Sequence, residues 1–154
     1  MKIPFTQTAR HNINSNISSD FFAKLPEMIL NHTAWEYSYQ HRVDGCFLKP
    51  TFKNMPYRNS FVPEINIVAS CHDTQTMLHI SGQPVKFVRI FMAFWFSFLL
   101  LMEMFLLVLI ITSRDSIFPV FIPIGMGVFG YLLCELGTKV TFNSVVKAIK
   151  KECP

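Results

Sequence analysis

The sequence lacks the short motifs that mark the common enzyme classes. Its 154 residues contain no P-loop, no GxGxxG turn, no GxSxG nucleophile elbow and no HExxH metal motif. The carboxylates Glu36 and Glu64 stand alone, without an acid–base partner nearby in the sequence. These absences give no support to an enzymatic reading, and we expect a non-enzymatic protein without a cofactor.

Metal-binding patterns are also missing. The four cysteines form no CxxC pair, and the five histidines are scattered along the chain. His41 and His79 fall on expected strands and are candidate neighbours across a sheet, but a zinc site needs three or four converging ligands. The sequence therefore predicts no metal site, and it predicts reduced thiols if the cysteines face a cytoplasm.

Charge is sparse and slightly basic. Lys and Arg number 14 against 10 Asp and Glu, which gives a formal net charge of +4. Because residues 1–85 contain no dense basic cluster, no nucleic-acid partner is expected. The excess is better explained by attraction to anionic lipid headgroups, so we expect a lipid bilayer as a partner.

Long apolar runs are the main feature that is present. Ile90–Ser113 is 24 residues long and carries one charge, Glu103. A bilayer-crossing helix needs about 20 apolar residues, and a soluble helix would show a polar stripe. Ile117–Cys134 is a second run of 18 uncharged residues. The connector Ser113–Ser116 is so short that the two spans must form an antiparallel transmembrane hairpin, which we place at residues 86–136.

The basic residues near the span ends predict the orientation. Lys86 and Arg89 precede the first span, whereas the connector holds only Arg114. Four more follow the second span: Lys139, Lys147, Lys150 and Lys151. Positive charge is retained on the cytoplasmic side, so both termini are expected there. A signal peptide is not expected, because the first apolar run begins far from the N-terminus.

Residues 1–85 predict a cytoplasmic α+β domain. We expect a helix over Asp20–Asn31, disturbed by Pro26, and an extended segment before it. Alternation of apolar residues predicts strands at Trp35–Val43, Cys46–Phe52, Phe61–Ser70 and Thr76–Gly82. Asp44-Gly45 predicts the first hairpin turn, and Gly82-Gln83-Pro84 is expected to end the sheet. The fold class is therefore an antiparallel sheet with one or two short helices, joined to a two-helix transmembrane hairpin.

The last segment, residues 137–154, predicts a basic amphipathic helix. Phe142, Val145, Val146 and Ile149 recur at helical spacing, and the lysines lie opposite them. Such a helix fits either of two places, the sheet of the soluble domain or the membrane surface. We favour the sheet, because it otherwise has a single helix to cover it.

Three segments resemble a family of small uncharacterised bacterial two-span membrane proteins. They are Tyr57–Pro63 (YRNSFVP), Phe91–Phe96 (FMAFWF) and Ile122–Tyr131 (IPIGMGVFGY). The order of elements is similar too: an extended start, a short helix, strands, two spans and a basic amphipathic tail. The resemblance implies a bacterial inner-membrane protein and no activity.

Glu103 is the first candidate site residue. Counting from the connector places it level with Gly127, where a glycine permits close approach of two helices. Membrane-embedded charges are expensive and often functional, so we expect Glu103 in a contact within the hairpin or between copies, or along an ion path. The remaining alternative is a lipid-facing Glu103 with little role. Packing of the spans is assigned to Gly125, Gly127, Gly130 and Cys134, and the protein is expected to form a homo-oligomer.

The most ligand-like cluster of the soluble domain is Tyr57-Arg58-Asn59. Arg and Tyr side chains hold anions or stack on bases, although a loop at the lipid headgroups would have the same composition. Two functions follow. The leading one is an interaction or scaffold module at the inner membrane. The alternative is a membrane effector or pore former whose β-rich domain binds a small anionic signal, such as a cyclic nucleotide.

Overall fold

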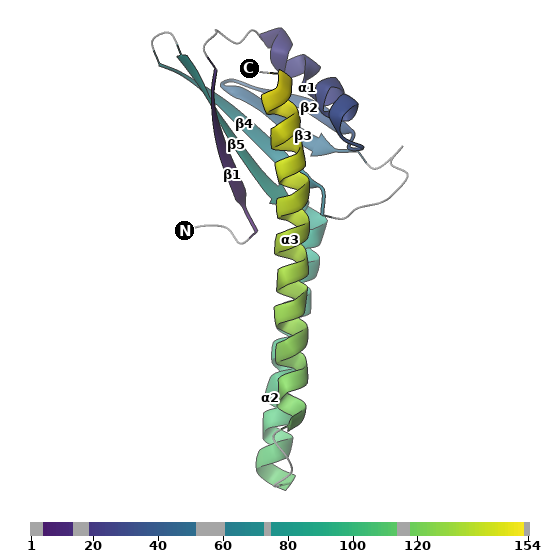
Figure 1. Cartoon of the computed structure of the whole chain (residues 1–154). Helices are drawn as coiled ribbons and strands as arrows, with labels where there is room; N and C mark the ends of the chain where they lie inside the picture. Colours follow the sequence, from purple (N-terminus) through teal and green to yellow (C-terminus); the bar gives the residue numbers. More distant parts are fainter. Residues whose placement is uncertain (1–4, 14–18, 52–60, 73–74, 114–117, 153–154) are drawn as a thin grey trace. The chain divides into compact units, whose positions relative to one another are not determined.

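The chain forms two compact units, Met1–Val85 with Gly137–Pro154 and Lys86–Leu136, called the sheet unit and the hairpin unit below. The structure is a computed structural model that describes residues 5–13, 19–51, 61–72, 75–113 and 118–152 (Figure 1). It contains a five-stranded antiparallel sheet and three α-helices, two of them long and apolar. The predicted fold class, an α+β domain joined to a helical hairpin, is confirmed.

The sheet is a meander to which the first strand is added at the end. Its spatial order is β1-β5-β4-β3-β2, and every neighbouring pair is antiparallel. The strands are β1 (Gln7–Ile13), β2 (Tyr37–Arg42), β3 (Gly45–Pro50), β4 (Pro63–His72) and β5 (Gln75–Pro84). Ile67 lies opposite both Cys46 and Ile80, so alternate residues of successive strands form one apolar face.

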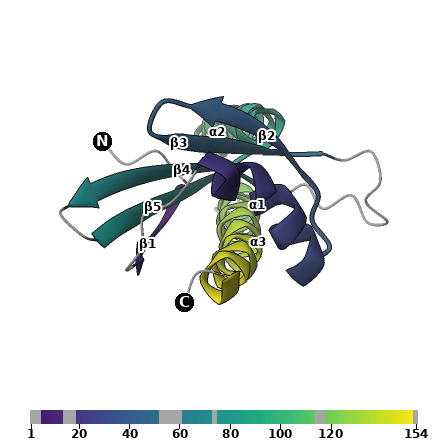
Figure 2. The ribbon, with the colours of Figure 1, turned by 90° about the horizontal axis from the view of Figure 1, so that it is seen from above.

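Two helices pack on this apolar face. From α1 (Ser19–His32) the buried residues Phe22, Leu25 and Ile29 enter the core. The second half of α3 (Phe121–Glu152) contributes Phe142, Val145, Val146 and Ile149, which confirms that the amphipathic C-terminal segment packs on the sheet (Figure 2). This segment is the continuation of α3 rather than a helix of its own. Burial of these apolar side chains is what stabilises the unit.

Two local expectations need correction. Arg42 pairs with Gly45, so the turn residues between β2 and β3 are Val43 and Asp44. The glycine serves close packing instead, because a Cβ at Gly45 would collide with the carbonyl oxygen of Ile67. Likewise Gly82 does not end the sheet: β5 continues to Pro84, and the missing side chain at Gly82 makes room for the Phe142 ring. The helix expected over Asp20–Asn31 is confirmed, since α1 runs from Ser19 to His32 with Pro26 inside it.

A hydrogen bond connects α3 to the chain just before β4. The Thr141 hydroxyl donates to the Phe61 carbonyl at 2.8 Å, and the same oxygen lies 2.9 Å from the Gly137 carbonyl. A Cβ at Gly137 would lie 2.7 Å from the Phe61 ring, so only glycine allows this approach. The sheet unit thus includes chain from both sides of the hairpin.

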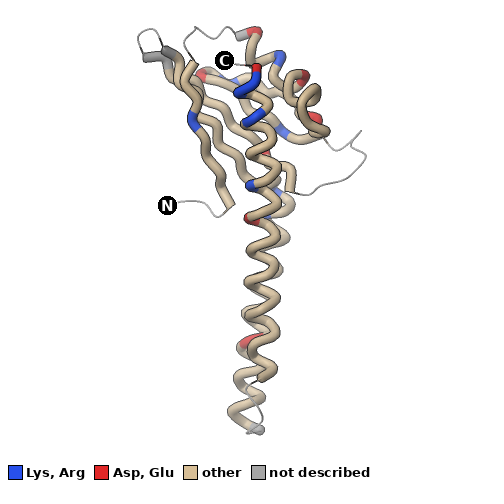
Figure 3. Tube along the Cα trace, viewed as in Figure 1, with Lys and Arg blue, Asp and Glu red and all other residues tan. Residues whose placement is uncertain are grey.

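The hairpin unit contains α2 (Lys86–Ser113), a 3₁₀ turn η1 (Phe118–Val120) and the first half of α3. Helix α2 has no Gly or Pro, and its 28 residues extend about 42 Å at 1.5 Å per residue. Leu, Met and Phe make up most of α2, and most of the large apolar side chains of both helices in this unit are exposed. Lys and Arg concentrate in the sheet unit, and charge is nearly absent along the hairpin (Figure 3).

Candidate functional site in the helical hairpin

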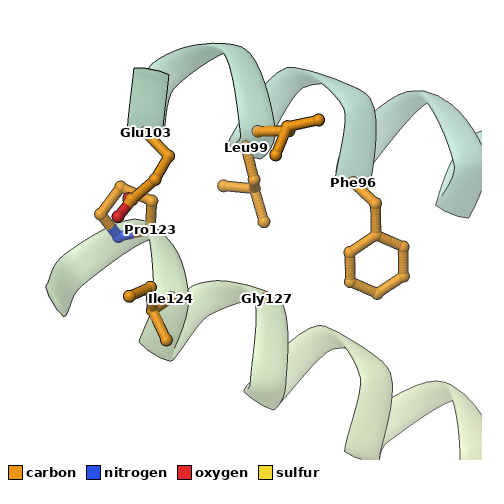
Figure 4. Close-up of a pocket in the computed structure, with 7 residues that line it drawn as sticks. Phe96, Leu99, Glu103, Pro123, Ile124 and Gly127 are labelled. Carbon is orange, nitrogen blue, oxygen red and sulfur yellow. The ribbon is translucent and has the colours of Figure 1, made fainter. Parts of the chain in front are cut away.

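A hollow between α2 and α3 brings Glu103 and Gly127 together. Its volume is about 180 Å³, and its walls are almost entirely apolar. The lining residues are Phe96, Leu99, Leu100, Glu103, Pro123, Ile124 and Gly127 (Figure 4). The two residues that the sequence placed at equal depth therefore lie on the same hollow, one on each helix.

The Glu103 carboxyl group has no hydrogen-bond partner among the described residues. Its Oε2 atom is shielded from solvent, and the side chain extends from α2 toward Pro123 of α3 (Figure 4). A shielded polar atom without a partner loses its hydration and gains nothing in return, which costs about 1–3 kcal/mol, and more when it is charged. Glu103 is therefore the one costly polar side chain of the described part of α2 between Ile90 and Ser113.

The hydroxyl groups of Ser97 and Thr112 in α2 are satisfied within the helix. The Ser97 hydroxyl donates to the Ala93 carbonyl at 2.8 Å, and the Thr112 hydroxyl donates to the Val108 carbonyl at 2.9 Å. Ser and Thr commonly bond in this way to the preceding turn. Both hydroxyl groups thus have a hydrogen-bond partner in the backbone of α2, whereas Oε2 of Glu103 has none among the described residues.

The glycines of α3 play different parts. A Cβ at Gly127 would lie 3.6 Å from Leu99, and one at Gly130 would lie 3.4 Å from Nε1 of Trp95. Both glycines therefore face α2 and let the helices approach. A Cβ at Gly125 would meet nothing within 4 Å, so this residue faces away from α2. Cys134, assigned to packing with them, is 1% exposed.

The candidate histidines His41 and His79 lie on different strands of the sheet unit. His41 lies opposite Cys46, whereas His79 lies opposite Arg10 and Val68, two strands away from that pair. No group of three His, Cys, Asp or Glu side chains within the described ranges is arranged to hold a metal ion. Burial raises the pKa of the Cys46 thiol to about 12, so it is a packing residue and a poor nucleophile.

The ligand-like cluster Tyr57-Arg58-Asn59 lies outside the described residues. A second hollow, which the sequence analysis did not find, lies at the β2–β3 turn and has a volume of about 410 Å³. It is lined by Arg42, Val43, Asp44, Gly45, Ile67 and Val68. The Arg42 guanidinium donates to Oδ1 of Asn66 at 3.2 Å and lies 5.1 Å from the centre of the Phe47 ring.

That hollow carries charges of both signs, because Arg42 and Asp44 both line it. Only the strand register reveals it: Arg42 pairs with Gly45, Gly45 with Val68, and so the three meet at one edge. The sequence alone does not show which residues pair across neighbouring strands, so this hollow could not be predicted from it.

No family model matches the chain, and the searches of curated proteins and of solved structures returned no match either. Any function of the chain is therefore inferred from its own residues.

Proposed function

We propose that this chain is an integral membrane protein whose hairpin crosses the inner membrane of a bacterium. In this proposal the sheet unit lies in the cytoplasm and acts as a non-enzymatic interaction or scaffold module. The observation that carries the membrane assignment is the exposed apolar surface of both long helices. Lipid is the solvent in which such a surface is stable.

Burial separates this hairpin from the core helices of soluble proteins. In the most apolar 18-residue window, 6% of α2 and 17% of the helix from Phe118 to Glu152 are buried. A core helix of a soluble protein is mostly buried, because exposed apolar area costs about 25 cal/mol per Å² in water. A signal sequence lies close to the N-terminus, whereas α2 begins at Lys86.

The two chain segments that make up the sheet unit support the proposed topology. This unit includes Met1–Val85 and Gly137–Pro154, so both ends of the hairpin return to one folded body. Two spans are the smallest number that brings the chain back to the side from which it left. The lysines of α3 after Gly137, together with Lys86 and Arg89, place positive charge on this side, which favours the cytoplasm.

A scaffold role is supported by the sheet's second face. Residues such as Arg10, Gln40 and Ser70 alternate with the core residues and are exposed, so a polar surface of five strands faces away from α1 and α3. A folded domain held at the membrane with such a surface is suited to binding another protein there. A partner recovered with the intact protein from detergent extracts, and lost on Arg10→Glu, is the expected result.

The alternative function is a membrane effector that senses a small anionic ligand. It is favoured by the hollow at the β2–β3 turn, where Phe47 and Asn66 hold the Arg42 guanidinium in place. Arg42→Gln should then abolish any ligand-induced depolarisation of cells that overproduce the protein. Ser38→Ala on the same strand serves as control.

Topology mapping tests the membrane assignment. Single cysteines at Lys49 and Lys147, in a background without the native cysteines, should react with a membrane-impermeant maleimide only when the cytoplasmic side is accessible. A cysteine at Leu101 should stay unlabelled until detergent is added. The proposal is wrong if wild-type protein is extracted from membranes by alkaline carbonate, or if the Lys49 and Lys147 positions are labelled from opposite sides.

A further inference from the structure

We infer that Glu103 is the hydrogen-bonding contact between two copies of this chain, which pair about a two-fold axis along the membrane normal. The inference rests on the membrane assignment above and extends it by naming the partner and the residue. Its starting point is the shielded Oε2 atom, which finds no partner among the described residues of one chain. A partner supplied by a second chain relieves the cost of this unpaired atom.

Depth restricts what the partner is. Glu103 is the fourteenth of the 24 residues from Ile90 to Ser113, so it lies near the middle of the first span. At that depth neither water nor headgroups are available, and a charged group costs about 2.5–3.5 kcal/mol or more. The nearest polar side chain of α2, Ser97, is about 9 Å away along the helix and already donates to Ala93.

A second copy supplies a partner at the right depth by symmetry. Rotation about an axis along the membrane normal leaves the depth of every residue unchanged, so Glu103 of one copy lies level with Glu103 of the other. Only a two-fold axis gives a contact in which the same residue pairs with itself across a closed interface. Two protonated carboxyl groups each donate one hydrogen bond and accept one, so each satisfies the hydrogen-bonding demand of the other.

The surroundings of Glu103 allow this approach. The hollow beside it has a volume of about 180 Å³, and Glu103 is the only one of the described lining residues with a polar side chain. An ordered water needs two to four polar partners, so this hollow is a poor water site. Gly127 has no side chain to fill it, and small residues at a helix interface let a neighbouring helix come close. Side chains of the second copy therefore fill the hollow and bring its carboxyl group into reach.

Cysteine cross-linking in native membranes tests the inference. In a background without the native cysteines, Glu103→Cys should form an oxidant-induced disulfide dimer. The matched controls are Leu101→Cys and Phe105→Cys, which lie within about 3 Å of the same depth. Both are exposed, at 69% and 62%, and two residues along a helix places them on the other side of it. They should remain monomeric.

Cross-linking at 103 alone, limited to a dimer, supports the inference. Equal cross-linking at all three positions, none at 103, or a ladder beyond the dimer overturns it. Because all three variants must stay in the carbonate-resistant membrane fraction, a failed cross-link is distinct from a failed membrane assignment. If the variants are extracted, the proposed function itself is wrong.

A second measurement tests the hydrogen bond without new cysteines. Glu103→Leu should weaken dimerisation in nanodiscs about three- to thirtyfold, the range expected for loss of one interhelical hydrogen bond. Glu103→Gln should retain the dimer, since an amide both donates and accepts. Met104→Leu is the control for altered packing at the same depth. Equal dimerisation of the Leu and Gln variants would contradict the role of the carboxyl group.

Discussion

Leu78 and Leu101 are both leucines, but they differ in how far their side chains are exposed. Leu78 of β5 is fully buried in the sheet unit, whereas Leu101 of α2 is 69% exposed. The sheet unit places apolar side chains inside and polar ones outside, as water requires. The hairpin unit exposes most of its large apolar side chains and shields an oxygen of the Glu103 carboxyl group. Under the proposed membrane assignment, the sheet unit is surrounded by water and the hairpin unit by lipid, and burial of the surface that each solvent disfavours explains both patterns.

The largest effect should come from emptying the core of the sheet unit. Ile149 of α3 is fully buried, so Ile149→Ala should lower the free energy of unfolding by about 2–5 kcal/mol. The exposed Lys150 on the same helix is the control, and Lys150→Ala should change it by less than about 0.5 kcal/mol. Urea unfolding in detergent, followed by the circular dichroism of the sheet, gives both values. Equal effects would remove α3 from the core.

An arginine introduced at an exposed apolar residue should have different effects in the two units. Val43 is 96% exposed at the β2–β3 turn, so Val43→Arg should be almost neutral. Leu101→Arg should cost about 2.5–3.5 kcal/mol of insertion energy if α2 crosses a bilayer. The readout is the fraction of protein that resists carbonate extraction. A Leu101→Arg variant that inserts as well as wild type would mean that α2 does not face lipid.

The glycines sharpen the comparison further. Gly45→Ala drives a Cβ into the backbone of β4, and we expect a loss of about 1–3 kcal/mol. Gly125→Ala meets nothing within 4 Å and replaces a poor helix former, so it should be neutral or stabilising by up to about 1 kcal/mol. Thermal unfolding of both variants distinguishes these outcomes. A destabilised Gly125→Ala would show that a neighbour contacts this face of α3.

The smallest effect concerns the buried thiol. Burial raises the pKa of Cys46 from 9.0 to about 12 in the folded chain. Between these values the unfolded chain loses the proton that the folded chain keeps, so unfolding becomes easier as pH rises. The stability of the wild type should therefore fall more steeply above pH 9 than that of Cys46→Ala, whereas below pH 9 the two proteins should show the same dependence on pH. Parallel curves for the two proteins would contradict this.

Much of the sheet unit could be predicted because its residues obey local periodicity. Alternation at Ile65, Ile67 and Ala69 predicted β4, and helical spacing of Phe142 and Ile149 predicted the packing of α3. Gly82 misled, because its role depends on the Phe142 ring, 60 residues further along the chain. A lone sequence contains no such tertiary contact, and a glycine next to a proline is typical of a strand end.

The candidate site was predictable only in part. The charge pattern alone singled out Glu103, and the short connector placed it level with Gly127. The hollow between them depends on which side of each helix faces the other, and the sequence leaves this open where no polar stripe marks a face. For the same reason Gly125 was assigned to packing alongside Gly127, although only Gly127 and Gly130 face α2.

The accessibility of spin labels at two positions tests the central claim most directly. Nitroxides are attached to Leu101→Cys and Val43→Cys, both in protein reconstituted into liposomes and free of the native cysteines. Molecular oxygen concentrates in lipid, and a charged nickel chelate stays in water. The label at 101 should collide mainly with oxygen, and the label at 43 mainly with the chelate. Equal accessibility of both labels to the chelate would place α2 in water and contradict the account.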